Sequence, residues 1–481
     1  MADTGTASTS SEHDGSFTAK TYKRRWWILL VFSFTSCVQS AVYNTWPPVA
    51  DALKIGFGWS DSFSAVMLLM YCTAVIMGTF PVMYSIDNIG VRHGMVLSTA
   101  VSVLCSAVWL VGLPLRQTWL LALGSFLNGL GSTVTSSLPT VISTSWFSVS
   151  ERTTATSIAS MGYLGTAVAF FAGPYISGAN VTASEVINKD TLPTEFVDQL
   201  QTGVLNILYF MTALTVVGFW FTIIYFPSQP PQCPSKAQTH PRESFWPGMK
   251  HLLSNSHFWK LTLAYNLPNS IFNSWIPFCS VSFRSLGVDE VKLETHNSLC
   301  MEPVTSGWIG FSALLISSLL SIPISWIADR FKRKLKLFLQ LANGLALALC
   351  LILALIQRGC ISISDHQLSI AVLYILSIGA ATCINGFIPI YYELASECAF
   401  PVDESLACAL LTTLNNVIGV VFFLLLLIPA LASDSEWMMW TCVGACALAV
   451  PLLFFMKENY YRLDVDTACT QTDEEYRAVV S

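Results

Sequence analysis

The chain has 481 residues, of which 53% are hydrophobic and only 11% are charged, and its formal net charge is −6. Because soluble proteins carry roughly a quarter charged residues, this composition excludes an ordinary soluble protein and indicates an all-α protein that crosses the lipid bilayer many times. The acidic balance gives no reason to expect a nucleic-acid partner.

Twelve apolar runs are long enough to cross a bilayer as helices. A polar tail, residues 1–25, precedes them, and the first run is full-length, so no cleavable signal peptide is expected. The first six spans are predicted at 26–49, 63–84, 95–113, 118–140, 154–177 and 203–226, within a bundle over residues 26–226. After a Pro- and Ser-rich linker, residues 227–257, the second six are predicted at 258–283, 304–328, 335–356, 367–391, 404–428 and 437–456. They form a second bundle over residues 258–457, and residues 458–481 form a polar tail.

The positions of lysine and arginine set the orientation. With the N-terminus inside, the inner segments hold 18 of the 24 Lys and Arg residues. This excess predicts that both tails and the linker are cytoplasmic. Asn180-Val181-Thr182 then lies in an outer loop, where it fits the pattern for N-glycosylation of Asn180.

A motif at the end of the first run recurs at the end of the seventh. Asn44-Thr45-Trp46-Pro47-Pro48 is matched by Asn273-Ser274-Trp275-Ile276-Pro277. An amide, an aromatic ring and a helix-breaking proline at corresponding places in two halves are typical of paired discontinuous helices around a central site. The repeat therefore predicts a carrier whose two bundles enclose a substrate site.

Two short cytoplasmic loops carry similar charges. Asp87-Asn88-Ile89-Gly90-Val91-Arg92-His93-Gly94 follows the second span, and Asp329-Arg330-Phe331-Lys332-Arg333-Lys334 follows the eighth. A carboxylate at a helix end can cap a neighbouring helix or pair with an arginine. We expect Asp87, Arg92 and Asp329 to latch one conformation and release it in another; the alternative is that these charges only set the topology.

These features resemble known families. The Asp-x-x-Gly-x-Arg-x-Gly pattern at 87–94, repeated without glycines in the second half, and the six-plus-six spans resemble the major facilitator superfamily. Trp146-Phe147 with Glu151-Arg152, and Pro389-x-x-x-Glu393-x-x-x-Glu397-x-x-x-Pro401, resemble the feline leukaemia virus subgroup C receptor-related transporters. Residues 43–46, 158–165, 307–311 and 458–464 indicate one branch of that family.

The resemblance implies a proton-coupled carrier of the lysosomal membrane that exports a small organic metabolite, with pyridoxine (vitamin B6) as the first candidate. The alternative within the family is facilitative transport of choline or ethanolamine, and the alternative location is the plasma membrane. A non-transporting receptor or scaffold is the alternative of another class. The resemblance gives no reason to expect an oligomer, and we expect a monomer.

The predicted spans contain almost no charge away from their ends, so they lack the buried Lys or Arg expected for a phosphate or dicarboxylate ligand. Amides and aromatic rings suit a neutral or weakly cationic molecule. We expect substrate contacts at Tyr43, Asn44, Trp46, Tyr163, Asn269, Asn273, Trp275 and Asn416. The alternatives are interhelical hydrogen bonding for the amides and a membrane-interface position for the tryptophans.

Tyr163 and Asn416 occupy corresponding places in the fifth and eleventh spans, shortly before Gly165 and Gly419. Both are therefore expected to face one cavity. The resemblance implies glutamines at these positions in choline-transporting relatives, so Tyr and Asn here favour a ring-bearing ligand.

Protons are the expected coupling ion. Glu393, near the inner end of the tenth span, is the first candidate to carry the proton, and Glu397 is the second. Glu151 and Arg152 are expected to belong to the same gate. The alternative is that Glu393 forms a structural ion pair with Arg152 or another cytoplasmic base.

The remaining features concern sorting and chemistry. Tyr476-Arg477-Ala478-Val479 matches the pattern that sorting adaptors read, through Tyr476 and Val479, on the way to endosomes and lysosomes. Cys300 and Cys360 lie in outer loops, where a disulfide between them is one option. No spacing of Cys and His indicates a metal site, and no catalytic motif indicates an enzyme or a cofactor.

Overall fold

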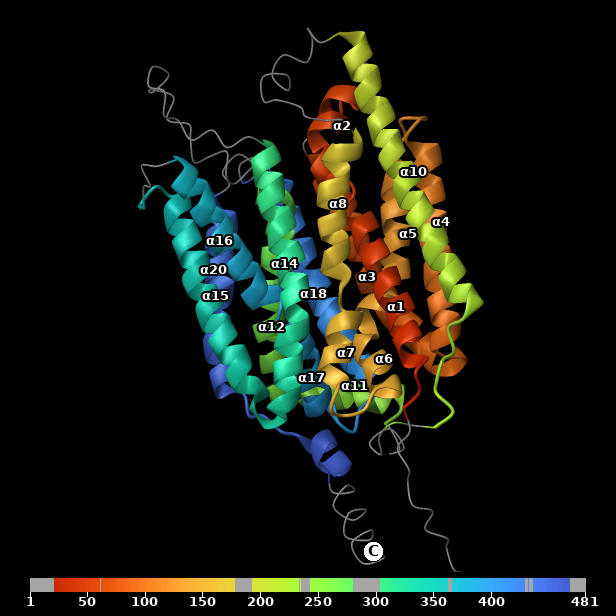
Figure 1. Cartoon of the computed structure of the whole chain (residues 1–481), viewed down its shortest axis with the longest axis vertical. Coiled ribbons are helices and arrows are strands. Elements are labelled where there is room, and N and C mark those ends of the chain that lie inside the picture. The colour runs from red at the N-terminus through yellow and green to blue at the C-terminus, as the bar shows by residue number, and fades with distance from the viewer. Residues whose placement is uncertain are drawn as a thin grey trace, which may run out of the picture.

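The structure, a computed structural model, describes residues 21–60, 62–177, 193–232, 234, 243–279, 303–361, 366–428, 431 and 436–467. Within these ranges it is helical and contains no strand. The long helices run along the long axis of the molecule and form two bundles (Figure 1).

Each bundle contains six spans. The first holds α1 (Arg25–Tyr43), α3 (Ser62–Ile89), α4 (Val91–Gly112), α5 (Thr118–Ser137) with α6 (Pro139–Trp146), α7 (Arg152–Ala159) with α8 (Gly162–Ser177), and α10 (Thr194–Ile224). The second holds α12 (Ser256–Trp275), α14 (Pro303–Arg330), α15 (Leu335–Gln357), α16 (His366–Asn385) with α17 (Ile388–Ala399), α18 (Glu404–Leu426) and α20 (Glu436–Phe455). Ten of these spans are apolar enough to cross a membrane by composition alone. The other two, α5 and α12, are 20-residue helices with more polar residues, and the predicted fold of two six-helix bundles is confirmed.

The bundles meet along two pairs of helices. α3 packs against α18, and α8 packs against α14. Apolar side chains from both sides form one shared core, which includes Leu68 and Phe170 from the first bundle and Ile271 and Leu314 from the second. Four helices therefore form the walls between which a site can open and close.

Three predicted spans are interrupted. α5 ends before α6 at Leu138, α7 is separated from α8 at Ser160 and Met161, and α16 from α17 at Gly386 and Phe387. Pro139 and Pro389 lie in the first turn of α6 and α17, where the missing amide hydrogen costs little because the first N–H groups of a helix have no intrahelical acceptor.

The repeated Asn-x-Trp motifs do not interrupt their helices in mid-span. α1 and α12 run unbroken to Tyr43 and Trp275. A 3-10 turn follows each of them, η1 (Pro47–Val49) after α1 and η4 (Ile276–Phe278) after α12. The discontinuity predicted from the motifs therefore lies at the helix ends, and η1 contacts η4 across the interface between the bundles.

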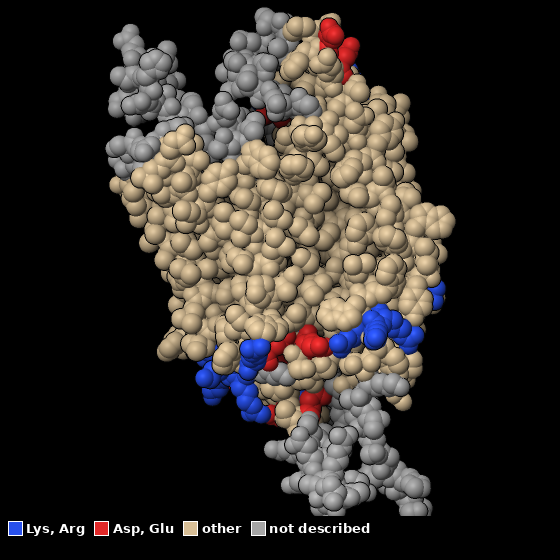
Figure 2. Space-filling model, in the orientation of Figure 1, with Lys and Arg blue, Asp and Glu red and all other residues tan. Residues whose placement is uncertain are grey.

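Most of the lysine and arginine side chains visible in Figure 2 gather at one end of the molecule, where α3 meets α4 and α14 meets α15. We call this the basic end; it is the end that the sequence predicts to face the cytoplasm. α11 (Phe245–Ser254), inside the predicted linker, contacts α18 there. A short helix, residues 461–467, follows α20 in the predicted tail.

Candidate functional site

A cavity of about 190 Å³ lies between the two bundles. Its lining comes from α1, α3, α5, α6 and α8 of the first bundle and from α12, α14, α17 and α18 of the second. No charged residue is among the described residues that line it. The volume is below the roughly 300–1,000 Å³ of drug-sized sites, so the cavity suits a small ligand of little or no charge.

Five tyrosines give the cavity an aromatic wall: Tyr43, Tyr71, Tyr163, Tyr265 and Tyr392. The ring centroids of Tyr43 and Tyr71 are 4.0 Å apart, with 31° between the ring planes. Such rings offer faces for stacking or for a cation and hydroxyl groups for hydrogen bonds.

An asparagine network joins this wall to the second bundle. Asn273 Nδ2 donates to the Tyr163 hydroxyl at 3.3 Å, and that hydroxyl donates to Asn269 Oδ1 at 3.3 Å. Asn385 exchanges two hydrogen bonds with Asn273, at 2.9 and 3.2 Å. Asn415 donates to Asn269 at 3.0 Å. A ligand that competes for the Tyr163 hydroxyl would therefore act on both bundles at once.

The structure brings most of the predicted substrate residues together. Tyr43, Asn44, Tyr163, Asn273 and Asn416 line the cavity, and Asn269 lies one hydrogen bond behind it. The amides of Asn44 and Asn416 are also held by their own bundles, since Asn44 donates to Thr166 Oγ1 at 3.1 Å and Asn416 donates to the Thr412 carbonyl at 2.8 Å.

Trp46 and Trp275 do not line the cavity, contrary to the prediction. Trp46 is 1% exposed, and its ring packs edge-on against Trp109 and Phe63, at 4.8 and 5.4 Å between centroids. Trp275 is 2% exposed and packs against Phe272 at 5.6 Å. Both indoles are instead buried in apolar cores, where their large rings gain more contact area than in a narrow polar cavity.

The break after α5 contributes a polar group that the sequence did not indicate. Carbonyls in the last turn of a helix lack an intrahelical partner. The Ser136 carbonyl accepts hydrogen bonds from the Tyr392 hydroxyl at 3.3 Å and from Thr412 Oγ1 at 3.1 Å, both in the second bundle. Tyr71, Tyr392 and these hydroxyl residues were missed because isolated polar residues in apolar runs carry no spacing signal.

Towards the basic end, Asp329 joins the two bundles by capping a helix of the other bundle, as a carboxylate at a helix end can. Asp329, at the end of α14, accepts from the backbone N–H groups of Thr153 and Thr154 at 3.0 and 2.9 Å and from Thr154 Oγ1 at 2.7 Å. It thereby caps the N-terminus of α7 in the other bundle, where a negative charge is favourable.

The corresponding loop of the first half, residues 87–94, makes no such contact through its carboxylate. Asp87 is exposed and forms no hydrogen bond or ion pair with the residues that the structure describes. Arg92 is tied through its backbone N–H, which donates to Ser228 Oγ at 3.0 Å. The loop without glycines therefore makes the contact between the bundles, because it is the one that ends beside α7.

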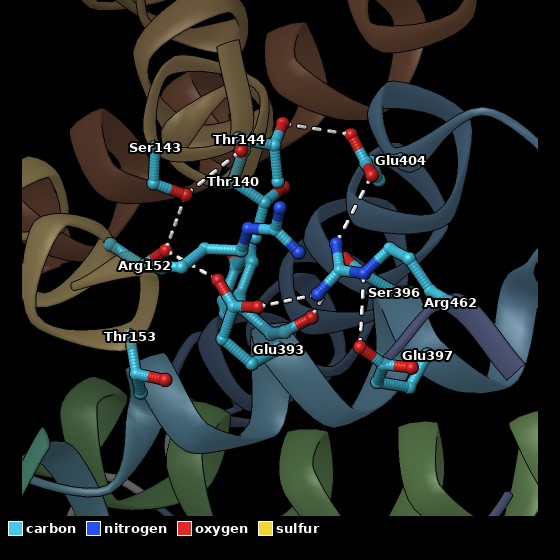
Figure 3. A network of polar contacts seen from close by, with 12 residues as sticks. Thr140, Ser143, Thr144, Arg152, Thr153, Glu393, Ser396, Glu397, Glu404 and Arg462 are labelled. Carbon is cyan, nitrogen blue, oxygen red and sulfur yellow. Dashed lines mark hydrogen bonds and ion pairs between the residues drawn. The ribbon is translucent and has the colours of Figure 1, made fainter. Parts of the chain in front are cut away.

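A buried arginine holds three glutamates at the basic end (Figure 3). Arg462 pairs with Glu393 at 2.6 Å, with Glu397 at 3.0 Å and with Glu404 at 3.1 Å. Burial lowers the pKa of Arg462, but the three carboxylates raise it, and the net pKa lies above the usual range. Arg462 therefore stays charged.

The same carboxylates contact the first bundle. Thr156 Oγ1 donates to Glu393 Oε1 at 2.7 Å, and Thr144 Oγ1 donates to Glu404 Oε2 at 2.9 Å. Glu393 and Glu404 thus lie in the contact between the bundles, and Glu393 forms a structural ion pair with Arg462, as the alternative interpretation of Glu393 expected of a nearby base. Sequence reasoning missed Arg462 because one arginine in a polar tail resembles a topology signal.

Two further ion pairs flank this gate. Arg152, at the start of α7, lies 3.4 Å from Asp466 in the segment after α20. Glu151 pairs with Arg25 at 2.8 Å inside the first bundle and is partly exposed. Arg152 therefore belongs to the contact between the bundles, whereas Glu151 belongs to the edge of one bundle.

Three buried cysteines lie close enough to hold a soft metal ion. The sulfur atoms of Cys350, Cys442 and Cys446 lie within 4.8 Å of one another, and none of the three lines the cavity. No metal-ligand spacing is visible in the sequence because the thiols come from two helices, α15 and α20. Cys360 is a free, exposed thiol, while Cys300, Asn180, Tyr476 and Val479 lie outside the described residues.

Comparisons with known proteins agree with this architecture. The model of the Major Facilitator Superfamily matches residues 28–397. The chain belongs to the Major Facilitator Superfamily. The transporter FucP, solved in the outward conformation, has the same fold, with a TM-score of 0.57 and 13% identity over 89% of this chain and 100% of that one.

Within the superfamily, the chain is similar to members of solute carrier family 49. The solute carrier family 49 member 4 homolog of Xenopus laevis is 30% identical over 455 residues, which cover 93% of this chain and 94% of that protein. The choline/ethanolamine transporter FLVCR1 of Mus musculus is 24% identical over 411 residues, covering 83% of this chain and 69% of that protein. These matches confirm the resemblance to the feline leukaemia virus subgroup C receptor-related transporters that the sequence motifs around Trp146 and Glu393 indicated.

Proposed function

We propose that this facilitator is an alternating-access carrier of a small, neutral or weakly cationic, ring-bearing metabolite, with pyridoxine as the first candidate. The observation that carries the proposal is an uncharged cavity, between two bundles, lined by five tyrosines and by asparagines. A hydroxylated pyridine ring can stack on tyrosine faces and exchange hydrogen bonds with amides.

Choline or ethanolamine is the second candidate. The similarity to relatives described as choline/ethanolamine transporters favours it, and tyrosine faces can hold a quaternary ammonium by cation–π attraction. The two candidates differ in the number of hydrogen bonds that they can exchange with the asparagines, because choline has one hydroxyl group and pyridoxine has several.

The positive-inside rule supports a basic end in the cytoplasm. We infer that the contacts of Asp329 and of the Arg462 cluster close the cavity at that end in this conformation. We propose the lysosomal membrane as the site of action, the plasma membrane as the alternative, and export driven by protons that reach the Glu393 carboxylate.

The proposal is tested by uptake at the cell surface. Tyr476→Ala, which removes the adaptor pattern, should accumulate the carrier in the plasma membrane, where labelled pyridoxine and choline are compared at acid and neutral external pH. Saturable pyridoxine uptake that rises in acid and is not inhibited by excess choline supports the proposal. Choline uptake without pyridoxine uptake overturns the choice of substrate.

A further inference from the structure

The segment after the last span is packed into the molecule. Residues 456–467 leave α20 at the basic end, and residues 461–467 are helical. Met456, Tyr460 and Leu463 are buried, and Arg462 is among the most deeply buried large side chains of the protein. A polar tail would leave these side chains in solvent, so the segment is held by specific contacts.

Those contacts reach both bundles. The backbone N–H of Leu463 donates to Glu397 Oε2 at 3.1 Å, beside the three ion pairs of Arg462 with the second bundle. Asp466 meets Arg152 of the first bundle at 3.4 Å. Because Glu393 and Glu404 also accept hydrogen bonds from the first bundle, Arg462 lies where the two bundles are joined.

The contact between the bundles at this point depends on Arg462, because its positive charge compensates three buried carboxylates. Three carboxylates are held close together by one guanidinium, and all four side chains are at most 7% exposed. Removing one partner from a buried charge cluster leaves uncompensated charges that only hydration relieves. Hydration of Glu393, Glu397 and Glu404 requires the bundles to separate at the basic end.

We propose that residues 456–467 are a moving part of the gate: Arg462 locks the basic end closed and withdraws from the three glutamates when that end opens. Arg462 is thus a positioning residue of the transport cycle, outside the twelve spans. This inference rests on the alternating-access mechanism proposed above and does not depend on the identity of the cargo.

Cys408 reports the state of this gate without any substrate. It is 0% exposed, and its sulfur lies 2.9 Å from Thr140 Oγ1 of the other bundle. A membrane-impermeant maleimide added from the basic side reaches it only when the bundles part there. The rate of Cys408 alkylation in the full-length protein, in inside-out vesicles, is followed by mass spectrometry.

Arg462→Ala should raise the rate of Cys408 alkylation by about tenfold or more, the change that corresponds to a shift of roughly 1.4 kcal/mol towards the open gate. Arg333→Ala is the matched control. It breaks the exposed pair of Arg333 with Asp464 in the same segment and should leave the rate unchanged.

A second variant separates gating from misfolding. Arg462→Gln combined with Glu393→Gln, Glu397→Gln and Glu404→Gln removes the lock and leaves no buried charge uncompensated. Because no uncompensated charge then favours the open gate, it should elute as the wild type does on size exclusion and label at Cys408 more slowly than Arg462→Ala does. Wild-type labelling rates in an Arg462→Ala protein that elutes normally, or equally fast labelling of the single and quadruple variants, would overturn the proposal; a failed substrate assignment would not alter either rate.

Discussion

Tyr163 is one of the side chains in the cavity wall that bond across the two bundles. It belongs to α8, yet its hydroxyl is bonded to Asn269 and Asn273 of α12. Glycine at 165, two residues on, lets the backbone of α8 lie against α1, since a Cβ there would be 1.7 Å from the Cys37 carbonyl oxygen. The close backbone contact fixes where the Tyr163 ring enters the cavity.

Tyr163→Phe should lower the initial rate of uptake by about thirtyfold, since it removes two hydrogen bonds of about 1 kcal/mol each and keeps the ring. Tyr163→Ala and Asn416→Ala, which also remove ring or amide contacts to the cargo, should abolish uptake. Rates are measured per carrier at the cell surface. Tyr175→Ala, on the same helix but 79% exposed, is the control. Normal uptake in both alanine variants would remove Tyr163 and Asn416 from the substrate site.

Glu393 is the residue at which protonation would act on the gate. As a carboxylate it pairs with Arg462 at 2.6 Å, and a proton on it would cancel that attraction. Glu393→Gln mimics the protonated form at every pH, so uptake should lose its rise in external acid. The pH profile is compared with that of Glu243→Gln, whose carboxylate lies 3.3 Å from exposed His251. An unaltered profile in Glu393→Gln would assign proton coupling to another group.

Individual cavity residues could be predicted from the sequence where the internal repeat indicates which way a side chain points. Tyr163 and Asn416 could be placed on one cavity because corresponding helices present corresponding faces to the pseudo-symmetry axis. Trp46 and Trp275 could not, because a residue at a helix end has no face set by periodicity. Arg462 could not be found at all, since its partners lie on other helices.

At the scale of the element, the closest helix contacts depend on glycines, which let two backbones approach, more than on large apolar side chains. In lipid, hydrophobic burial does not drive helices together, so close packing does. Gly165 and Gly203 are both sites where a Cβ would meet the backbone of another helix, at 1.7 and 2.2 Å.

Gly165→Ala should therefore force α1 and α8 apart and destabilise the protein by about 1–3 kcal/mol, the usual cost of overpacking. Thermal unfolding of the purified protein in detergent measures the effect. Gly444→Ala, on α20, is the control, because nothing lies within 4 Å of a Cβ built there. Equal melting temperatures for the two variants would mean that the α1–α8 contact is looser than described.

The spans themselves could be predicted closely, because an apolar run of fixed length has few alternatives in a bilayer. The interruptions of α5, α7 and α16 could not, since only two of the three are marked by proline in the following helix. The break between α7 and α8 is held by tertiary contacts from α1, where Ser33 Oγ donates to the Ile158 carbonyl at 2.7 Å and Cys37 Sγ donates to the Met161 carbonyl at 2.9 Å.

At the scale of the whole molecule, the closed basic end defines from which side the cavity can be reached. Cys72 lines the cavity and serves as a native probe of that access. A thiol reagent applied from the side opposite the basic end should modify Cys72 more slowly than exposed Cys360, and bound cargo should protect Cys72. Modification of Cys72 from the basic side alone would show that the resting carrier opens the other way.

The position of Arg462 in the chain affects the order of biosynthesis. It is translated after every membrane helix, so the residue that fastens the two bundles together reaches them only after the twelfth span has left the ribosome. The newborn carrier must be assembled unfastened, and only the final stretch of translation completes its closure.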